Sequence, residues 1–422
     1  MINETHYDVV VFGGGPAGST TAALLAQKGR RVLLLEKGKF PRYHVGESLM
    51  PFCWFTLERL GLASRMDEVG YTRKYSVQFV RPEGSQSQPF YFFQHKDHPS
   101  STTWQVERSE FDLMLLDRAR ELGVEVREET AVQRVLKNDS GAVIGVEATG
   151  PSGKSFTALA AVTVDATGRE GFFQVREGWR VRDPQLNKVS IWTYYRGAKR
   201  DPGIDEGTTT VAYIPERGWF WYIPLRNDIV SVGVVAERDY LFKETRDPGA
   251  IMDREIQKNS WLREHLAGGE QFGEYWVTSD FSYRSKYCAT DGLVLVGDAF
   301  AFLDPVFSSG VFLALKSGEL AADAIDAALT ADDVSSGRFA DYGNQMCRGI
   351  ENMRKLVYSF YDPEFSFGRV IKAYPHLRAR LTDCLIGDLF EKDFEELFAA
   401  VAEFADLPAP LEHGRAPVAA AA

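Results

Sequence analysis

The strongest signal for the fold of this chain lies in its first 36 residues. Four segments follow one another there: the β-branched run DVVVF (8–12), the turn Gly13-x-Gly15-x-x-Gly18, the helix-like stretch TTAALLAQK (20–28), and the apolar run RVLLL (31–35) closed by Glu36. A strand, a glycine-rich turn, a helix and a second strand ending in an acid form the frame of a dinucleotide-binding βαβ unit. The sequence therefore predicts an α/β chain that begins with a Rossmann-like parallel sheet.

Each residue type in this frame has a physical role. Gly13 permits the tight turn, Gly15 lets the backbone approach a pyrophosphate, and Gly18 lets helix and strand pack closely. The N-terminus of the helix, which includes Ala17, then faces the phosphates. Glu36 accepts hydrogen bonds from the ribose hydroxyls, and its charge disfavours a 2′-phosphate, so NADP is not expected here.

A second ligand-binding signal lies far downstream. The short strand 293–296 runs into Gly297-Asp298-Ala299, and a long helix is predicted over 311–329. This order resembles the second FAD motif of the para-hydroxybenzoate hydroxylase group, in which the aspartate holds the ribityl chain. The segment VTVDATG (162–168) resembles a further strand–turn element of that group. The resemblance implies that the dinucleotide is FAD and that Asp298 binds it.

Three further segments narrow the family: FPRYHVGESLMP (40–51), WFWYIP (219–224) and DPVFSSG (304–310). Together with GGGPAGS and the region around Arg73-Lys74, they resemble the flavin-dependent halogenases over roughly residues 5 to 345. The pattern is most similar to the branch that acts on phenolic, pyrrolic or carrier-protein-tethered substrates. WxWxIP by itself is less specific, because geranylgeranyl reductases carry a looser form of it.

The resemblance implies a mechanism that depends on Lys74. Reduced FAD and oxygen convert chloride or bromide into hypohalous acid, which travels through a tunnel to a lysine beside an electron-rich aromatic substrate. Lys74 is expected between a helix over 54–69 and a strand over 75–80. Burial in an apolar tunnel lowers the pKa of an amine and makes it a better donor or nucleophile. From the residues alone, a solvated surface lysine is the alternative reading, because Lys74 belongs to an Arg-Lys pair.

The DPVFSSG segment supplies the expected halide site. By resemblance, Ser308 neighbours the lysine and Pro305 shapes the loop beside the flavin. The backbone amides of Ser309 and Gly310 are expected to hold the halide, since small residues with free N–H groups at a helix N-terminus suit an anion. A simple helix cap is the plainer reading of Ser-Ser-Gly, and the two readings are compatible. The free-tryptophan halogenases carry a glutamate where this chain has Phe307, so a phenol or pyrrole is expected rather than tryptophan.

Aromatic and basic residues complete the predicted site. Trp219 and Trp221 are expected to separate the substrate from the flavin. Core packing along one face of a strand is the alternative, and it is compatible with a tunnel wall. Arg42, Ser48 and Arg108 are assigned to the flavin by resemblance. For Arg108, an i,i+4 ion pair along its own helix is an equally good reading.

Composition restricts the partners of the chain. The 422 residues carry 59 acidic and 48 basic side chains, a net charge of −11, which disfavours nucleic acid and anionic lipid. The four cysteines have no metal or redox spacing, so no metal site is expected. The N-terminus lacks the pattern of a secretory signal, and no apolar run is long enough to span a bilayer. We therefore expect a cytoplasmic protein without stable membrane insertion.

The expected FAD domain is discontinuous, with a mostly antiparallel sheet inserted on the substrate side: 1–75, 105–180 and 280–345 for the domain, 76–104 and 181–279 for the sheet. Residues 346–406 are predicted to be helical, and the Pro/Ala-rich residues 407–422 are predicted to be disordered. The helical region contains a basic stretch up to Arg380. That stretch either docks an acidic carrier protein or is an ordinary solvated helix face.

No second nucleotide site is visible, so reduced FAD is expected to come from a separate flavin reductase. Three alternative functions are an aromatic monooxygenase of the same fold, a geranylgeranyl-reductase-like flavoenzyme, and a degenerate flavin-binding protein. The monooxygenase would need neither Lys74 nor the paired tryptophans, and the reductase would want a long apolar tunnel. The intact GDA and DPVFSSG motifs argue against a degenerate protein.

Overall fold

The computed structural model describes residues 4–215, 218–363 and 365–417. Its first sheet has the order β16-β17-β10-β1-β2-β7, and β8 and β9 extend it beside β10. β1 (Glu4–Phe12) pairs in parallel with β2 (Val32–Leu35) and with β10 (Ser155–Asp165), as predicted for a Rossmann-like unit. The other strands of this sheet are β7 (Glu125–Arg127), β8 (Ala131–Lys137), β9 (Val143–Thr149), β16 (Ala289–Thr290) and β17 (Leu293–Leu295).

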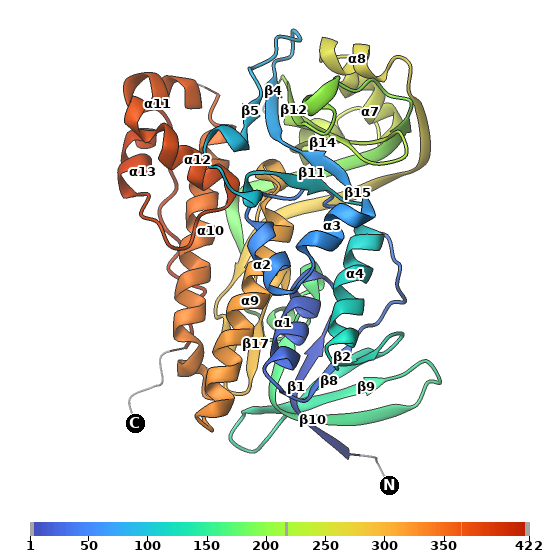
Figure 1. Cartoon of the computed structure of the whole chain (residues 1–422), viewed down its shortest axis with the longest axis vertical. Coiled ribbons are helices and arrows are strands. Elements are labelled where there is room, and N and C mark those ends of the chain that lie inside the picture. The colour runs from blue at the N-terminus through green and yellow to red at the C-terminus, as the bar shows by residue number, and fades with distance from the viewer. Residues whose placement is uncertain (1–3, 216–217, 364, 418–422) are drawn as a thin grey trace.

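Three long helices, α1 (Pro16–Gln27), α4 (Arg108–Glu121) and α9 (Ser309–Thr330), lie together beside this sheet (Figure 1). α1 and α9 cross closely at Gly318, where a Cβ would lie 2.6 Å from the carbonyl oxygen of Ala17. The close crossing brings α9 against the start of α1, next to the glycine turn. Two distant parts of the sequence therefore meet at one end of the first sheet.

The second sheet has the order β18-β15-β11-β14-β13-β12-β4-β5 and is antiparallel except where β12 meets β4. Its strands are β4 (Ser76–Val80), β5 (Phe90–Tyr91), β11 (Arg180–Arg196), β12 (Thr209–Ile214), β13 (Gly218–Pro224), β14 (Ile229–Glu237), β15 (Glu270–Ser285) and β18 (Ala301–Phe302). One face belongs to the main hydrophobic core, and the other packs under α6 (Arg238–Leu241), α7 (Pro248–Ile256) and α8 (Ser260–Leu266). This arrangement confirms the predicted α/β class with a mostly antiparallel second sheet.

A small two-stranded sheet is separate from the two larger ones. It consists of β3 (Thr72–Lys74) and β6 (Thr103–Gln105), so Lys74 lies on a strand and not in a connection. The single helix expected over 54–69 is wrong. Two helices, α2 (Cys53–Arg59) and α3 (Ala63–Val69), occupy this region, because Gly61 takes a left-handed conformation (φ +70°) that ends the first one.

The C-terminal part of the chain begins with α10 (Ala340–Tyr361), which lies alongside α9 in Figure 1. The shorter helices α11 (Phe367–Ala373), α12 (Arg378–Ile386) and α13 (Glu395–Ala402) follow, and α5 (Phe172–Arg176) is the remaining α-helix of the described chain. In the described part of the chain, no helix is long and apolar enough to cross a membrane.

The tail differs from the predicted disorder over its described length. The carbonyl oxygens of Ala409 and Leu411 accept hydrogen bonds from Arg354 and Arg284, and Gly414 donates its N–H to the carbonyl oxygen of Lys286. Composition indicated disorder because the tail has little apolar surface of its own. Buried arginines elsewhere in the chain supply the donors that order it. Residues 418–422 lie outside the described residues.

Candidate active site

The glycine turn after β1 makes the close contacts that its sequence predicts. Gly13 has φ +108°, and a Cβ there would lie 2.2 Å from the carbonyl oxygen of Ala166. A Cβ on Gly18 would lie 1.9 Å from the carbonyl oxygen of Gly13. Only glycine therefore lets α1 begin this close to the ends of β1 and β10.

Glu36 follows β2 with a buried and oriented carboxylate. Its Oε2 accepts a hydrogen bond from the Gly14 N–H at 2.7 Å, and its Oε1 accepts one from the Gly38 N–H at 2.7 Å. Each carboxylate oxygen keeps a further lone pair for a ribose hydroxyl. The geometry fits the adenosine end of a dinucleotide that lacks a 2′-phosphate.

A cavity of about 630 Å³ extends from this turn to the second sheet. Its volume is in the range of cofactor sites. Most of the residues predicted to hold cofactor, halide or substrate lie on its wall: Gly13, Gly15, Ala17, Glu36, Arg42, Ser48, Arg108, Trp219, Trp221, Asp298, Pro305, Ser308 and Gly310. Three other predicted residues are not part of the lining surface: Gly18, Lys74 and Ser309.

Arg108 lies on the cavity wall and also forms the i,i+4 ion pair along its own helix that was the alternative prediction. It forms a bidentate ion pair with Asp112, at 2.7 and 2.9 Å, and it also lines the cavity. The same guanidinium donates to the carbonyl oxygen of Val45 at 2.7 Å. Arg42 approaches the Asp112 carboxylate at 3.5 Å. One buried acid therefore orients two cationic side chains of the cavity wall.

The turn that leads into α9 fits a small anion. Asp304 Oδ1 accepts the Val306 N–H at 3.1 Å, and Ser308 then adopts a left-handed backbone (φ 57°, ψ 28°). The buried hydroxyl of Ser309 has no hydrogen-bond partner within the described ranges, and a Cβ on Gly310 would meet nothing within 4 Å. Open space, an unsatisfied hydroxyl and the N-terminus of a 22-residue helix suit chloride or bromide.

Trp219 and Trp221 form part of the cavity wall on β13. Their ring centroids lie 6.2 Å apart, and both side chains belong to the main core, whereas Phe220 and Tyr222 face the core under α8. The Trp221 indole N–H donates to Ser231 Oγ at 3.1 Å. The pair is therefore both a packed part of the core and a wall of the cavity, as the two readings of WxWxIP allowed.

Lys74 is buried, with 2% of its surface exposed. Its Nζ donates to Ser48 Oγ at 2.8 Å and to the carbonyl oxygen of Leu49 at 3.3 Å. Within the described residues it forms no ion pair, so burial lowers the pKa of this amine to about 7. The reading of Lys74 as a solvated surface lysine is wrong.

The structure corrects the expected neighbour of Lys74. The serine that bonds its ammonium group is Ser48, and Ser308 makes no hydrogen bond to it among the described residues. Ser48 bridges to Gln105 on β6, and β6 pairs with β3, so backbone pairing brings Ser48 and Lys74 together. Ser48 also shares a 2.9 Å hydrogen bond with Thr209, and both line the cavity. The Lys74 amine therefore contacts Ser48, and Ser48 lines the cavity.

Glu47 has a property that its sequence did not reveal. Glu47 belongs to the segment FPRYHVGESLMP (40–51), and no pattern in that segment predicts the protonation state of its carboxyl group. Tyr194 donates to Glu47 Oε1 at 2.6 Å, while Oε2 is buried without a partner in the described part of the molecule. Burial raises the pKa of this carboxyl to about 7. A group on the cavity wall therefore holds or releases a proton near neutral pH.

The lowered pKa of Lys74 predicts a pH-dependent change in stability. The folded state loses the Lys74 proton near pH 7, while the unfolded state keeps it up to about pH 10.5, so the folded state is penalised most at low pH. We expect Lys74→Met to raise the free energy of unfolding by a few kcal/mol at about pH 7. The gain should shrink as the pH rises toward about 10.5.

Urea unfolding of both proteins across this pH range checks the expectation. The difference in free energy between variant and wild type removes the contribution of every other titrating group. A constant difference between pH 7 and pH 10, or a less stable variant at pH 7, would contradict it.

The fold and the cavity together define a flavoprotein in which a Rossmann-like domain and a second sheet enclose one site. The family model for tryptophan halogenases matches residues 8–98 and 93–366 of this chain. The chain therefore belongs to the tryptophan halogenase family of flavin-dependent enzymes, which use FAD and a halide.

Individual relatives agree with this assignment. The chain is 34% identical over 394 residues to a pyrrole-2-carbonyl peptidyl-carrier-protein brominase of Pseudoalteromonas luteoviolacea, covering 93% of this chain and 94% of the relative. It is 29% identical to the corresponding chlorinase of Pseudomonas fluorescens, covering 92% and 91%. Among solved structures, the flavin-dependent brominase Bmp2 is 32% identical with a TM-score of 0.86, covering 95% of this chain and 97% of that one. The myxobacterial chondrochloren halogenase CndH is 32% identical with a TM-score of 0.78, covering 94% and 95%.

Proposed function

We propose that this chain halogenates an electron-rich aromatic ring with reduced FAD, oxygen and chloride or bromide. When bound, reduced FAD supplies two of the four electrons that take oxygen to water, and the halide with the substrate supplies the other two. The halide and one proton enter, the ring exchanges a hydrogen for the halogen, and two waters leave. The observation that carries the proposal is Lys74, an amine buried without an acidic partner in the described chain and one serine from the cavity.

The residues in and beside the cavity have separate roles. The N–H groups of Ser309 and Gly310 hold the halide at the start of α9, and the indoles of Trp219 and Trp221 keep the substrate away from the flavin. Lys74 receives or positions the oxidised halogen, because an amine with a pKa near 7 is partly neutral and nucleophilic at physiological pH. Glu36, Arg42, Arg108 and Asp298 hold FAD.

Phe307 favours a substrate whose aromatic ring reacts without help from a carboxylate of the enzyme. Its side chain lies among other aromatics, with ring centroids 6.0 Å from Phe360 and 6.3 Å from Phe367. A phenyl ring at this position cannot accept a proton from an indole, as a carboxylate can. A phenol or pyrrole activates itself through its own oxygen or nitrogen, and pyrrole is the ring named for the two carrier-protein relatives.

We further propose that the substrate is presented by an acidic carrier protein and that a separate flavin reductase supplies reduced FAD. Lys372 on α11 and Arg378 on α12 are exposed, and neither forms an ion pair within the described residues. Arg380, in contrast, approaches Asp383 at 3.7 Å. Two unpaired cations on neighbouring short helices form a suitable binding surface for the acidic side chains of a carrier protein.

Reversal of these two charges tests the docking proposal. We expect Lys372→Glu with Arg378→Glu to raise the KM for a carrier-tethered pyrrole about tenfold, and to leave turnover of a free phenol or pyrrole unchanged. The matched control is Lys154→Glu with Arg246→Glu, two exposed cations on other parts of the surface. Equal KM values for the two double variants would contradict the proposed surface.

The reaction itself is tested with reduced FAD from an added reductase, oxygen and bromide, and with a panel of phenols, free pyrroles and carrier-tethered pyrroles. Mass spectrometry distinguishes the outcomes. A brominated product supports the proposal. Hydroxylated product without bromine would support the monooxygenase alternative, and a reduced isoprenoid would support the geranylgeranyl-reductase-like one. Neither alternative is favoured by the relatives named above, which are halogenases.

A further inference from the structure

A chain of two hydrogen bonds joins three separate parts of the site. The indole N–H of Trp219 donates to the Tyr361 hydroxyl oxygen at 2.8 Å, and the Tyr361 hydroxyl donates to Asp304 Oδ2 at 2.8 Å. Trp219 belongs to the tryptophan wall on β13, and Asp304 begins the turn that leads into α9. Tyr361 is the last residue of α10. A residue of the C-terminal helical region therefore connects the two sides of the proposed halide site.

Asp304 holds the backbone of the turn that is proposed to bind the halide. Its side chain is completely buried, its Oδ1 holds the Val306 N–H, and its backbone N–H donates to Ser282 Oγ at 3.0 Å. Two residues after Val306, Ser308 takes the left-handed conformation that aims the first N–H groups of α9. A left-handed serine persists only when its surroundings enforce it. The Asp304 carboxylate helps to hold Ser308 in this conformation, because it fixes the Val306 N–H two residues earlier.

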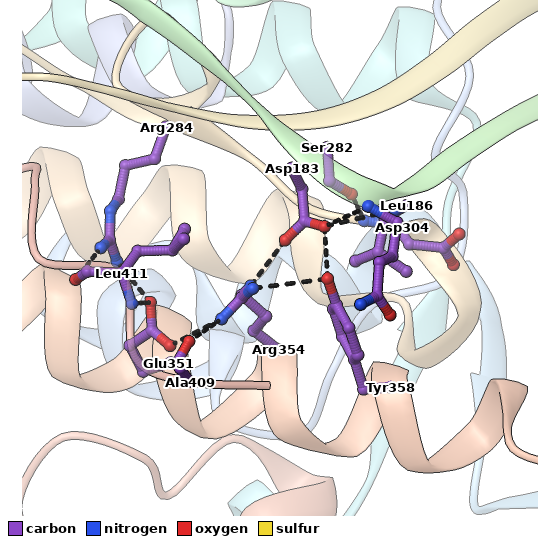
Figure 2. A network of polar contacts seen from close by, with 11 residues as sticks. Asp183, Leu186, Ser282, Arg284, Asp304, Glu351, Arg354, Tyr358, Ala409 and Leu411 are labelled. Atoms are coloured by element: carbon purple, nitrogen blue, oxygen red, sulfur yellow. Dashed lines mark hydrogen bonds and ion pairs between the residues drawn. The ribbon is translucent and has the colours of Figure 1, made fainter. Parts of the chain in front are cut away.

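Tyr361 itself is held in place by its helix. Arg354 on α10 pairs with Asp183 of β11 at 2.6 Å, and Tyr358 donates to the same carboxylate at 2.5 Å. One turn earlier, Glu351 pairs with Arg284 of β15 at 2.8 Å. Figure 2 shows these contacts as one network that ties α10 to the second sheet, with Asp304 and Ser282 beside it. Because α10 is anchored by one buried and one partly buried ion pair, the Tyr361 hydroxyl occupies a defined position.

We propose that Tyr361 is a positioning residue that sets the spacing between the tryptophan wall and the halide-binding turn. Its hydroxyl is suited to this task, since it accepts one hydrogen bond and donates another, and so satisfies a buried indole and a buried carboxylate at once. Phenylalanine would fill the same space and leave both groups without this partner. The assignment rests on the proposed function, because it concerns the same site.

The first test compares Tyr361→Phe with Tyr222→Phe. Tyr222 is a matched control: it is a buried tyrosine on β13 whose hydroxyl donates to the carbonyl oxygen of Lys199, facing the other core. We expect Tyr361→Phe to raise the KM for bromide about tenfold, the effect of losing a hydrogen bond to a charged group, with kcat at saturating bromide changed less than threefold. A bromide KM within twofold of wild type, or an equal rise in Tyr222→Phe, would overturn the proposal.

A second test does not depend on turnover. Oxidised, FAD-loaded protein with ¹⁵N-labelled tryptophan gives one indole N–H signal for each ordered tryptophan, and Trp219→Phe identifies the signal of Trp219. Tyr361→Phe should move this signal upfield and speed its exchange with water, while Tyr222→Phe should leave it in place. Chloride-35 line broadening by the same samples should weaken in Tyr361→Phe alone.

The two tests separate failure of this inference from failure of the proposed function. If wild type halogenates no substrate, the proposed function fails, and the indole signal and the chloride line width still decide the role of Tyr361. An unchanged Trp219 signal or an unchanged chloride line width in Tyr361→Phe overturns the inference even if the enzyme is fully active.

Discussion

Replacing Lys74 by alanine is expected to lower the rate of halogenated product formation by at least about a hundredfold, in the range of losses seen for groups that act directly on the reacting atoms. Consumption of reduced FAD should change little, because Lys74 lies behind Ser48 and outside the cavity surface that holds the cofactor. Hypohalous acid should then escape, and a thiol or a halogen-trapping dye in the assay should detect it. Product by mass spectrometry and reduced FAD by absorbance are measured on the same samples.

The control for this variant is Lys154→Ala, which removes an exposed lysine on the turn between β9 and β10. It should have wild-type rates of both product formation and FAD consumption. Ser48→Ala is informative as well, since it removes the hydroxyl that bonds the amine but keeps the amine. We expect it to be intermediate. If Lys74→Ala still forms product within twofold of wild type, Lys74 is not the group that delivers the halogen.

Adding a single methyl group at Gly18 is expected to weaken FAD binding by at least about a hundredfold and to destabilise the protein by roughly 1–3 kcal/mol. The Cβ of Gly18→Ala would lie 1.9 Å from the carbonyl oxygen of Gly13 and 2.9 Å from the Ala166 side chain, so α1 must move away from β1. This movement would displace the N–H groups at the start of α1, which are predicted to face the pyrophosphate. Flavin fluorescence titration and thermal unfolding measure the two effects.

Gly337→Ala is the matched control, because a Cβ at Gly337 would meet nothing within 4 Å and its φ is not in the left-handed region. This variant should bind FAD as wild type does. An FAD affinity for Gly18→Ala within threefold of wild type, together with an unchanged melting temperature, would contradict the close packing at this turn.

Much of the fold was predictable because its signals are local. The strand 8–12, the glycine turn and the strand 31–35 carry their conformation in neighbouring residue types, and the structure has β1 and β2 there. The long helix expected over 311–329 is α9, which begins two residues earlier, at Ser309. Local reading failed at Gly61, where one left-handed glycine divides a continuous helical pattern into α2 and α3.

The candidate site was predictable as a set of residues but not as an arrangement. The resemblance to halogenases named Lys74 and Ser308 together, whereas the structure places Ser48 on the amine. That contact depends on pairing between β3, β6 and the segment that contains Ser48. No spacing in the sequence predicts this pairing. The two hydrogen bonds of Tyr361 have no local signal in the sequence, because its partners are 57 and 142 residues away.

Short segments of the sequence predict which ligands the chain can bind: a dinucleotide at Gly13 to Gly18, a ribose at Glu36, and an anion at the start of α9. These depend on backbone freedom, charge and helix termini, which belong to short segments. The protonation of Lys74 and of Glu47, in contrast, depends on the folded structure. The pKa of Lys74 near 7 and that of Glu47 near 7 both come from desolvation by distant parts of the chain. Burial is a property of packing, and a segment does not carry it alone.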